Sequence, residues 1–126
     1  MTFQRSKVCI MLDNLPWKPL HHPTISWESN NTPYSQENRD IYYSKSNGID
    51  ESIYYFINNN DLLERLKTHT EDRFFIGELG FGFGLNFLMT VEKWRKQRTK
   101  GTLYYIAFEN RPVSADDLAK LQALLP

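Results

Sequence analysis

The sequence predicts an α/β fold built on a parallel sheet, and three observations lead to this prediction. From residue 61 the chain alternates helix, strand, helix, strand and helix, which is typical of a parallel sheet with helices on its faces. Both strand segments, residues 73–79 and 102–109, have mostly apolar centres, as strands buried on both faces do. A glycine-rich turn follows the first strand. Two strands cannot bury both faces of a sheet, so we expect the first part of a larger doubly wound domain, with a small complete α+β protein as the alternative.

Length and composition allow one ordinary domain of 126 residues. Fifteen basic residues balance fifteen acidic ones, so any contact with RNA must come from a local patch. Cys9 is the only cysteine, which excludes a disulfide framework and a thiolate zinc cluster, and we expect no metal site. No segment approaches the ~18 apolar residues of a membrane span. We therefore expect a cytoplasmic protein without a membrane partner.

The first part of the chain predicts a loose extension followed by a hairpin. Residues 1–22 are predicted to be poorly structured, because prolines restrict the residues that precede them. Residues 24–28 alternate as a short strand does, and the turn-forming residues 29–33 predict a hairpin that continues through Tyr34. Residues 40–43 predict a further short extended segment.

Helical periodicity begins after this hairpin. Apolar residues within 49–57 fall at helical spacing. Asp61 is expected to cap a second helix over residues 62–68. Ser114 is expected to begin the last helix, because Asp117 follows three residues later as in a capping box.

The glycine-rich turn IGELGFGFGLNFL, residues 76–88, joins the first predicted strand to a helix over residues 85–97. Such a turn lets the backbone approach a ligand closely. The spacing excludes a phosphate-binding P-loop, because Phe83 occupies the position of the required lysine. It also excludes the dinucleotide fingerprint G-x-G-x-x-G, whose third glycine would fall at Leu85 or Phe87.

The pattern that remains is Glu78-x-Gly80-x-Gly82-x-Gly84. A carboxylate beside the loop repels a pyrophosphate and suits a ligand that carries positive charge or hydroxyl groups. S-adenosylmethionine is such a ligand, because it has an ammonium, a sulfonium and a ribose but no phosphate. Glu109 ends the second strand, where an acidic side chain can accept both hydrogen bonds from a ribose diol. The alternative is a turn required only for packing, with Glu109 in solvent.

Three stretches of the chain resemble a known family. ELGFGFGLNFL (residues 78–88) resembles the cofactor loop of the methyltransferase domain that completes 5-methylaminomethyl-2-thiouridine at the wobble position of bacterial tRNAs. That domain occurs alone or fused to an FAD-dependent oxidoreductase. Residues 24–66 are similar to the family's opening segment in the Trp-to-Pro-Tyr-Ser spacing, the Asp-Ile-Tyr-Tyr-Ser run and the Gly-Ile-Asp-Glu helix start. IAFENRPVSADDLAK (residues 106–120) looks like its second strand, acidic strand end and following helix.

The resemblance covers residues 23–126 and implies the N-terminal portion of a truncated Rossmann-like class I methyltransferase domain, preceded by a short β-hairpin segment. It implies methyl transfer from S-adenosylmethionine to the amine of 5-aminomethyl-2-thiouridine in tRNA, with an FAD-dependent oxidoreductase domain or protein as a partner. The catalytic group is expected beyond residue 126, and residues 42–51 are expected to line the methionine end. The implied cofactor-binding residues are Glu78, Gly80, Phe81, Gly82, Gly84, Asn86 and Glu109.

Two other functions remain open from the sequence. One is a non-enzymatic remnant that binds S-adenosylmethionine or a nucleoside. The other is a fragment of a dinucleotide-binding oxidoreductase, which shares the strand–helix alternation. The basic residues within 93–100 could contact tRNA phosphates, but they also suit the negative end of a helix dipole.

Overall fold

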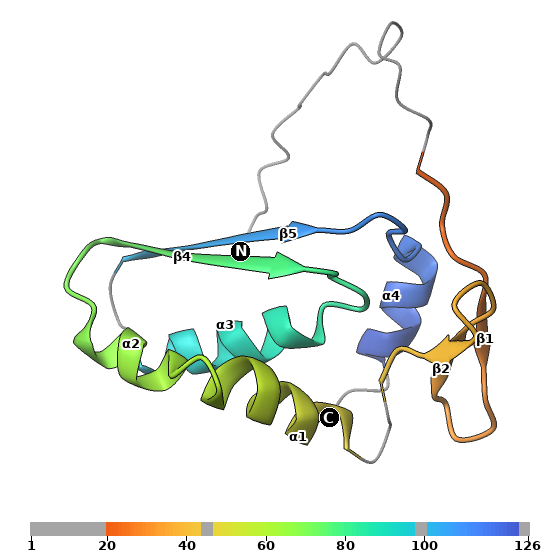
Figure 1. Ribbon diagram of the computed structural model, residues 1–126, viewed down its shortest axis with the longest axis horizontal. Coiled ribbons are helices and arrows are strands. Elements are labelled where there is room, and N and C mark those ends of the chain that lie inside the picture. The colour runs from red at the N-terminus through yellow and green to blue at the C-terminus, as the bar shows by residue number, and fades with distance from the viewer. Residues whose placement is uncertain (1–19, 44–46, 98–100, 124–126) are drawn as a thin grey trace, which may run out of the picture.

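The computed structural model describes residues 20–43, 47–97 and 101–123. Residues 1–19 of the predicted extension lie outside this description, as do three residues of the basic segment. Ten elements follow one another along the described chain (Figure 1). They are β1 (Ile25–Trp27), β2 (Pro33–Ser35), β3 (Asp40–Ile41), α1 (Gly48–Ser52), the π-helix η1 (Ile53–Asn58), α2 (Leu62–Thr68), β4 (Arg73–Leu79), α3 (Leu85–Gln97), β5 (Thr102–Phe108) and α4 (Ala115–Gln122).

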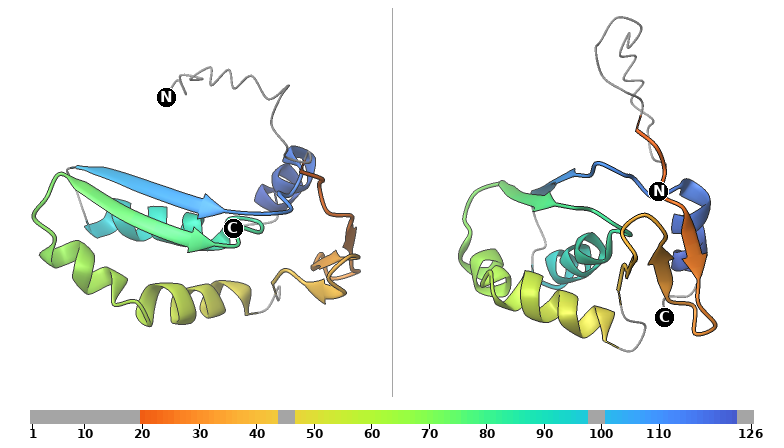
Figure 2. Two further views of the ribbon diagram at one scale, coloured as in Figure 1. Left: turned by 45° about the horizontal axis from the view of Figure 1, so that its top comes forward. Right: turned by 45° about the vertical axis from the view of Figure 1, so that its right-hand side comes forward.

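Strands β4 and β5 form the predicted parallel sheet, in a register that runs from Arg73 opposite Thr102 to Leu79 opposite Phe108. Helices α1, α2 and α3 and the π-helix η1 all lie against one face of this sheet (Figures 1 and 2). The predicted order of helices and strands from residue 61 is therefore confirmed. A buried cluster joins the helices to the sheet and consists of Ile57, Leu62, Leu66 and Phe74.

The prediction that both strands are buried on both faces is wrong. On the helix-covered face Phe74 is 4% exposed, whereas its neighbour Phe75 on the outer face is 57% exposed and Leu79 is 89% exposed. Alternate residues of a strand point to opposite faces, and the described helices cover only one of them. The outer face also carries the exposed side chains of Tyr104, Ile106 and Phe108.

The predicted hairpin is confirmed as a second, antiparallel sheet in the order β1-β2-β3. This sheet packs against α4, where Trp27 Nε1 donates a hydrogen bond to Asp117 Oδ1 at 3.3 Å. Lys120 Nζ lies 4.2 Å from the centroid of the Trp27 ring, close enough for a cation–π interaction. A second buried cluster forms here from Phe83, Val113 and Leu121.

The helix expected from residue 49 is confirmed, but its second half is a π-helix, in which Asn59 N–H donates to the Tyr54 carbonyl at 3.0 Å. Asp61 directly precedes α2 as expected, but the prediction that its side chain caps the helix is wrong. Asp61 has a φ of 50° and its side chain makes no capping hydrogen bond. A left-handed turn separates the two helices here instead.

The cap at Ser114 is confirmed and gives a first testable prediction. Ser114 Oγ accepts a hydrogen bond from Asp117 N–H at 3.1 Å and donates one to Asp117 Oδ2 at 2.7 Å. We expect Ser114→Ala to lower the free energy of unfolding by about 1 kcal/mol. Urea denaturation followed by circular dichroism would measure the change. Ser114→Asn keeps a capping oxygen and should retain most of the stability, and equal losses in both variants would contradict this explanation.

Candidate functional site

The site is built on the glycine loop between β4 and α3, where all three glycines have a positive φ. The φ values are 84° at Gly80, 52° at Gly82 and 76° at Gly84. Side-chain-bearing residues rarely adopt this conformation. The Gly80 N–H donates to the Phe108 carbonyl at 2.8 Å and therefore ties the loop to the end of β5. The spacing of the glycines is thus a requirement of the backbone path.

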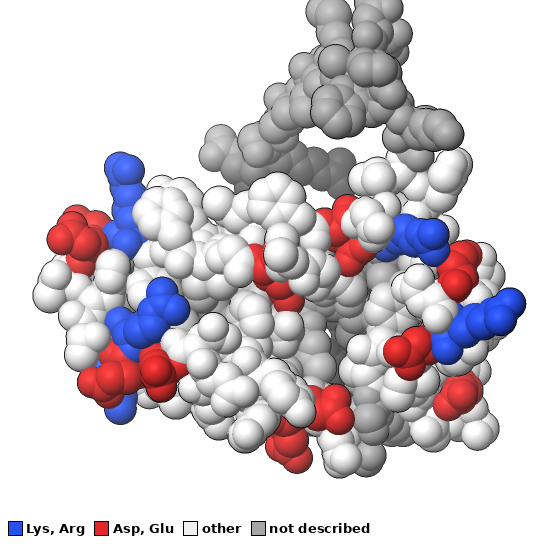
Figure 3. Space-filling view, viewed as in Figure 1, with Lys and Arg blue, Asp and Glu red and all other residues white. Residues whose placement is uncertain are grey.

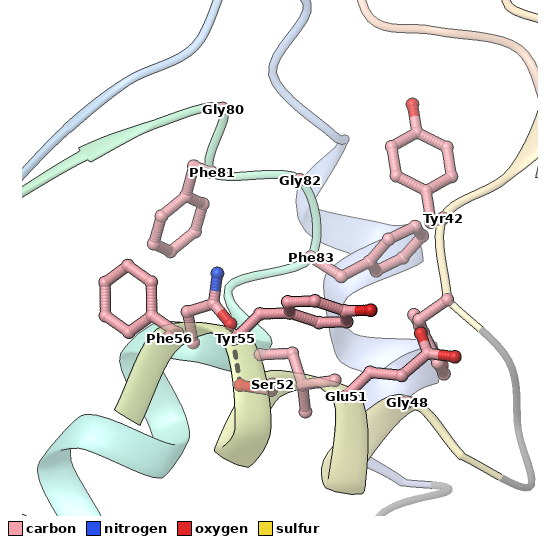
Figure 4. Close-up of a pocket in the computed structure, with 13 residues that line it drawn as sticks. Tyr42, Gly48, Glu51, Ser52, Tyr55, Phe56, Gly80, Phe81, Gly82 and Phe83 are labelled. Atoms are coloured by element: carbon pink, nitrogen blue, oxygen red, sulfur yellow. Dashed lines mark hydrogen bonds between the residues drawn. The ribbon is translucent and has the colours of Figure 1, made fainter. Parts of the chain in front are cut away.

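A cavity of about 330 Å³ lies between this loop and the helix α1–η1 (Figure 4). Its size is at the lower end of the ~300–1,000 Å³ found for small-molecule sites. One face of α1–η1 forms one wall, and the glycine loop with the start of α3 forms the other. Its lining consists of Tyr42, Tyr43, Gly48, Glu51, Ser52, Tyr55, Phe56, Gly80, Phe81, Gly82, Phe83, Leu85 and Asn86.

Four of the seven predicted cofactor-binding residues line this cavity, namely Gly80, Phe81, Gly82 and Asn86. The other three do not line the cavity: Gly84 belongs to the loop, and Glu78 and Glu109 lie beside it. The segment 42–51, which was expected near the methionine end, contributes Tyr42, Tyr43, Gly48 and Glu51. Parts of the chain that are more than 30 residues apart therefore meet here, as the resemblance implies.

Glu78 points toward the helices and is only 5% exposed. Its Oε1 accepts a hydrogen bond from Asn86 Nδ2 at 2.7 Å, and its Oε2 accepts one from the Tyr105 hydroxyl at 2.8 Å. Ser52 Oγ donates to Asn86 Oδ1 at 2.6 Å and extends the network to the wall of the cavity (Figure 4). Burial, together with the hydrogen bond to Glu78, raises the pKa of Tyr105, which keeps its hydroxyl a donor.

Glu109 holds the loop from the other side. Its Oε2 accepts a hydrogen bond from Gly82 N–H at 3.0 Å, and its Oε1 accepts one from Arg111 N–H at 2.9 Å. A carboxylate has about four lone-pair positions, so both oxygens can accept further hydrogen bonds from a ligand. The predicted position of this carboxylate beside the glycine loop thus agrees with the structure.

Aromatic rings pack around Phe83 and hold the glycine loop in place. The Phe83 ring packs edge-to-face on Tyr42, with ring centroids 4.9 Å apart, and on Trp27 at 5.8 Å. Burial raises the pKa of Tyr42, so its hydroxyl remains protonated at neutral pH. Phe83 therefore anchors the glycine loop in the cluster shared by the hairpin and α4.

Sequence reasoning missed Ser52, Tyr105 and the cavity-lining pair Tyr55 and Phe56. Tyr105 had a usable signal, because the alternation of β5 places it on the same face of the sheet as Glu78 in the neighbouring strand. Ser52 had none, because its contact with Asn86 joins residues 34 positions apart.

The described residues were also compared with the requirements of a metal site and of a membrane-spanning helix. No group of three or more His, Cys, Asp or Glu side chains there is arranged to hold a metal ion. Within the same ranges no helix is long and apolar enough to cross a membrane.

Comparison with curated proteins identifies relatives over most of the chain, although no family model matches it. It is 40% identical over 111 residues to the tRNA 5-methylaminomethyl-2-thiouridine biosynthesis bifunctional protein MnmC of Aeromonas salmonicida, a match that covers 85% of this chain and 17% of that protein. It is 34% identical over 118 residues to the MnmC of Aliivibrio fischeri, covering 89% of this chain and 17% of the relative. This chain is a homologue of the MnmC proteins. The resemblance inferred from the sequence is thereby confirmed.

The chain spans about a sixth of the length of these MnmC relatives. A solved structure, the crystal structure of MNMC2 from Aquifex aeolicus, superposes with a TM-score of 0.62 at 21% sequence identity. This match covers 84% of the chain and 38% of the MNMC2 chain, and it shows that the fold is shared.

Proposed function

We propose that this chain forms the S-adenosylmethionine-binding part of a methyltransferase that acts on the wobble uridine of tRNA. The reaction is transfer of a methyl group to the amine of 5-aminomethyl-2-thiouridine. The relatives named MnmC support the pathway, and the glycine loop beside a cavity supports the cofactor. An FAD-dependent oxidoreductase domain or protein is the partner that fits a bifunctional relative, and we place the reaction in the cytoplasm.

The observation that carries the choice of cofactor is the charge of the cavity. Among the described residues that line it, Glu51 is the one charged side chain, and none is a lysine or an arginine. The carboxylates of Glu78 and Glu109 lie on either side of the loop. Phosphate groups are disfavoured beside three carboxylates, whereas a ligand with an ammonium and a sulfonium is favoured.

The residues around the loop fit the parts of this cofactor. A Cβ atom at Gly82 would lie 3.6 Å from the ring of Tyr42, which also lines the cavity, so the glycine leaves the space beside this ring free. Backbone at Gly80 and Gly82 can pass close to the methionine part. Glu109 can accept hydrogen bonds from the ribose hydroxyls. When bound, S-adenosylmethionine supplies an activated methyl group on its sulfonium.

The chain's own contribution to the reaction is orientation. Transfer to an amine needs the amine unprotonated and in line with the methyl group, at about 3 Å. Glu109 holds the loop at Gly82, and the buried cluster of Phe83, Val113 and Leu121 holds it at Phe83. The loop therefore gives the cofactor a fixed position against which the amine can be oriented.

We expect Gly82→Val to abolish binding of S-adenosylmethionine, measured by isothermal titration calorimetry on the full chain. A β-branched side chain resists the φ of 52° and extends into the space beside Tyr42. Gly77→Val is the matched control, because a Cβ at Gly77 has no neighbour within 4 Å and should leave affinity unchanged. Unchanged affinity in Gly82→Val would show that the loop is only structural. No binding by the unmodified chain below millimolar concentration would argue strongly against the proposed function.

A further inference from the structure

Glu78 is a buried carboxylate whose hydrogen-bond partners are both neutral. The side chain is 5% exposed, and its two oxygens are held by the Asn86 amide and the Tyr105 hydroxyl. None of the ion pairs between described residues includes Glu78. Two neutral donors stabilise a carboxylate without neutralising its charge. The structure therefore holds a negative charge inside the protein that has no cation beside it among the described residues.

This charge lies directly behind one wall of the cavity. Asn86 lines the cavity and donates to Glu78 from its Nδ2, while its Oδ1 accepts from Ser52, which also lines the cavity. The two hydrogen bonds fix the orientation of the Asn86 amide, because its nitrogen must face the carboxylate and its oxygen the hydroxyl. Figure 4 shows Ser52 and its hydrogen bond at this wall. Glu78 is therefore separated from the cavity by one side chain.

An uncompensated charge in such a position acts on whatever occupies the cavity. Electrostatic interactions are stronger and less screened in a partly buried site than in water. Glu51 also lines the cavity, but it is exposed and its charge is screened by solvent. The buried carboxylate is thus the stronger source of selectivity for a cation.

We propose that Glu78 is a positioning residue whose negative charge, acting through Asn86, makes the cavity favour the sulfonium form of the cofactor over the neutral thioether that remains after methyl transfer. This inference rests on the proposed function and adds to it the means of discriminating cofactor from product. The sulfonium and the thioether differ by one methyl group and by the positive charge at sulfur. Their binding constants therefore report the electrostatic contribution of the site.

The test is calorimetric titration of the full chain with S-adenosylmethionine and with S-adenosylhomocysteine, its thioether. Glu78→Gln keeps the volume and both partners, because the new amide can accept from Asn86 and donate to the Tyr105 oxygen. In Glu78→Gln we expect the association constant for S-adenosylmethionine, divided by that for S-adenosylhomocysteine, to fall about tenfold. One charge that acts across a partly buried wall gives an effect of this size. A purely structural role would lower both affinities by the same factor and leave their ratio unchanged.

Two control variants separate charge from contact. Tyr105→Phe removes one hydrogen bond and keeps the charge, and Glu51→Gln removes the exposed carboxylate. Both should keep the ratio within about threefold of the unmodified chain. A ratio unchanged in Glu78→Gln, or one that falls in Glu51→Gln alone, would overturn the proposal.

A second measurement covers the case in which Glu78→Gln does not fold, which its circular dichroism would reveal. An analogue that carries an ammonium-bearing carbon in place of the sulfonium should then bind the unmodified chain at least tenfold more tightly than the thioether. Equal or weaker binding of this analogue would overturn the proposal. If the unmodified chain binds none of the three ligands, the proposed function itself fails, an outcome distinct from binding without charge selectivity.

Discussion

Gly84→Ala is expected to weaken ligand binding at the cavity and to lower the free energy of unfolding by about 1–3 kcal/mol. Two effects add at this position. The φ of 76° is unfavourable for any residue with a side chain. In addition, an ideal Cβ would lie 2.6 Å from Cζ of Phe81, far inside van der Waals contact. Phe81 lines the cavity, so relief of the clash must move a wall of the site.

Gly77→Ala is the control for this change, since it adds the same methyl group seven residues earlier in β4. A Cβ at Gly77 meets no atom within 4 Å, and glycine within a strand is itself unfavourable. We expect unchanged ligand affinity and a gain of up to about 1 kcal/mol in the control. Urea denaturation and calorimetry on both variants would measure these changes. Retained affinity in Gly84→Ala would mean that Phe81 can leave its position without cost to the site.

The local part of the fold could be predicted because its signals lie within a few residues of one another. The alternation from residue 61 gave the parallel pair β4 and β5, and the Ser114 cap follows from a four-residue pattern. The π-helix could not be predicted in the same way, because i→i+5 hydrogen bonding is rare and the apolar residues over 49–57 match the spacing of the far commoner α-helix. The exposed outer face of the sheet also departs from the prediction. An apolar strand indicates that something covers both faces, but it does not say which segment does so.

The residues of the candidate site also fall into those that the sequence could predict and those that depend on packing between distant segments. The conformation of the glycines and the position of Glu109 were predictable, because they depend on the backbone path and on the ends of neighbouring parallel strands. The position of Glu78 was predictable, but the direction of its side chain was not. Its contacts with Asn86 and Tyr105 depend on how α3 and β5 pack. The carboxylate of Glu78, which was expected to contact the ligand, therefore lies in the protein interior.

Leu66→Ala is expected to cause the largest loss of stability, about 2–5 kcal/mol in the free energy of unfolding. Leu66 is 1% exposed and belongs to the cluster that joins α2 and η1 to β4 through Leu62, Ile57 and Phe74. Truncation removes apolar contacts and leaves a cavity that neighbours on two helices and a strand cannot fill together. Equilibrium urea denaturation of the full chain, followed by far-ultraviolet circular dichroism, would measure the loss.

Leu79→Ala removes the same atoms from the outer face of the sheet and is the matched control. Leu79 is 89% exposed, so truncation should change the free energy of unfolding by no more than about 0.5 kcal/mol. Equal losses at Leu66 and Leu79 would contradict the assignment of the core to one face. They would require that the outer face, with Phe108 opposite Leu79 and Phe75 further along β4, is covered in solution by another polypeptide surface. The difference between the two variants therefore tests both the core and the exposure of the sheet.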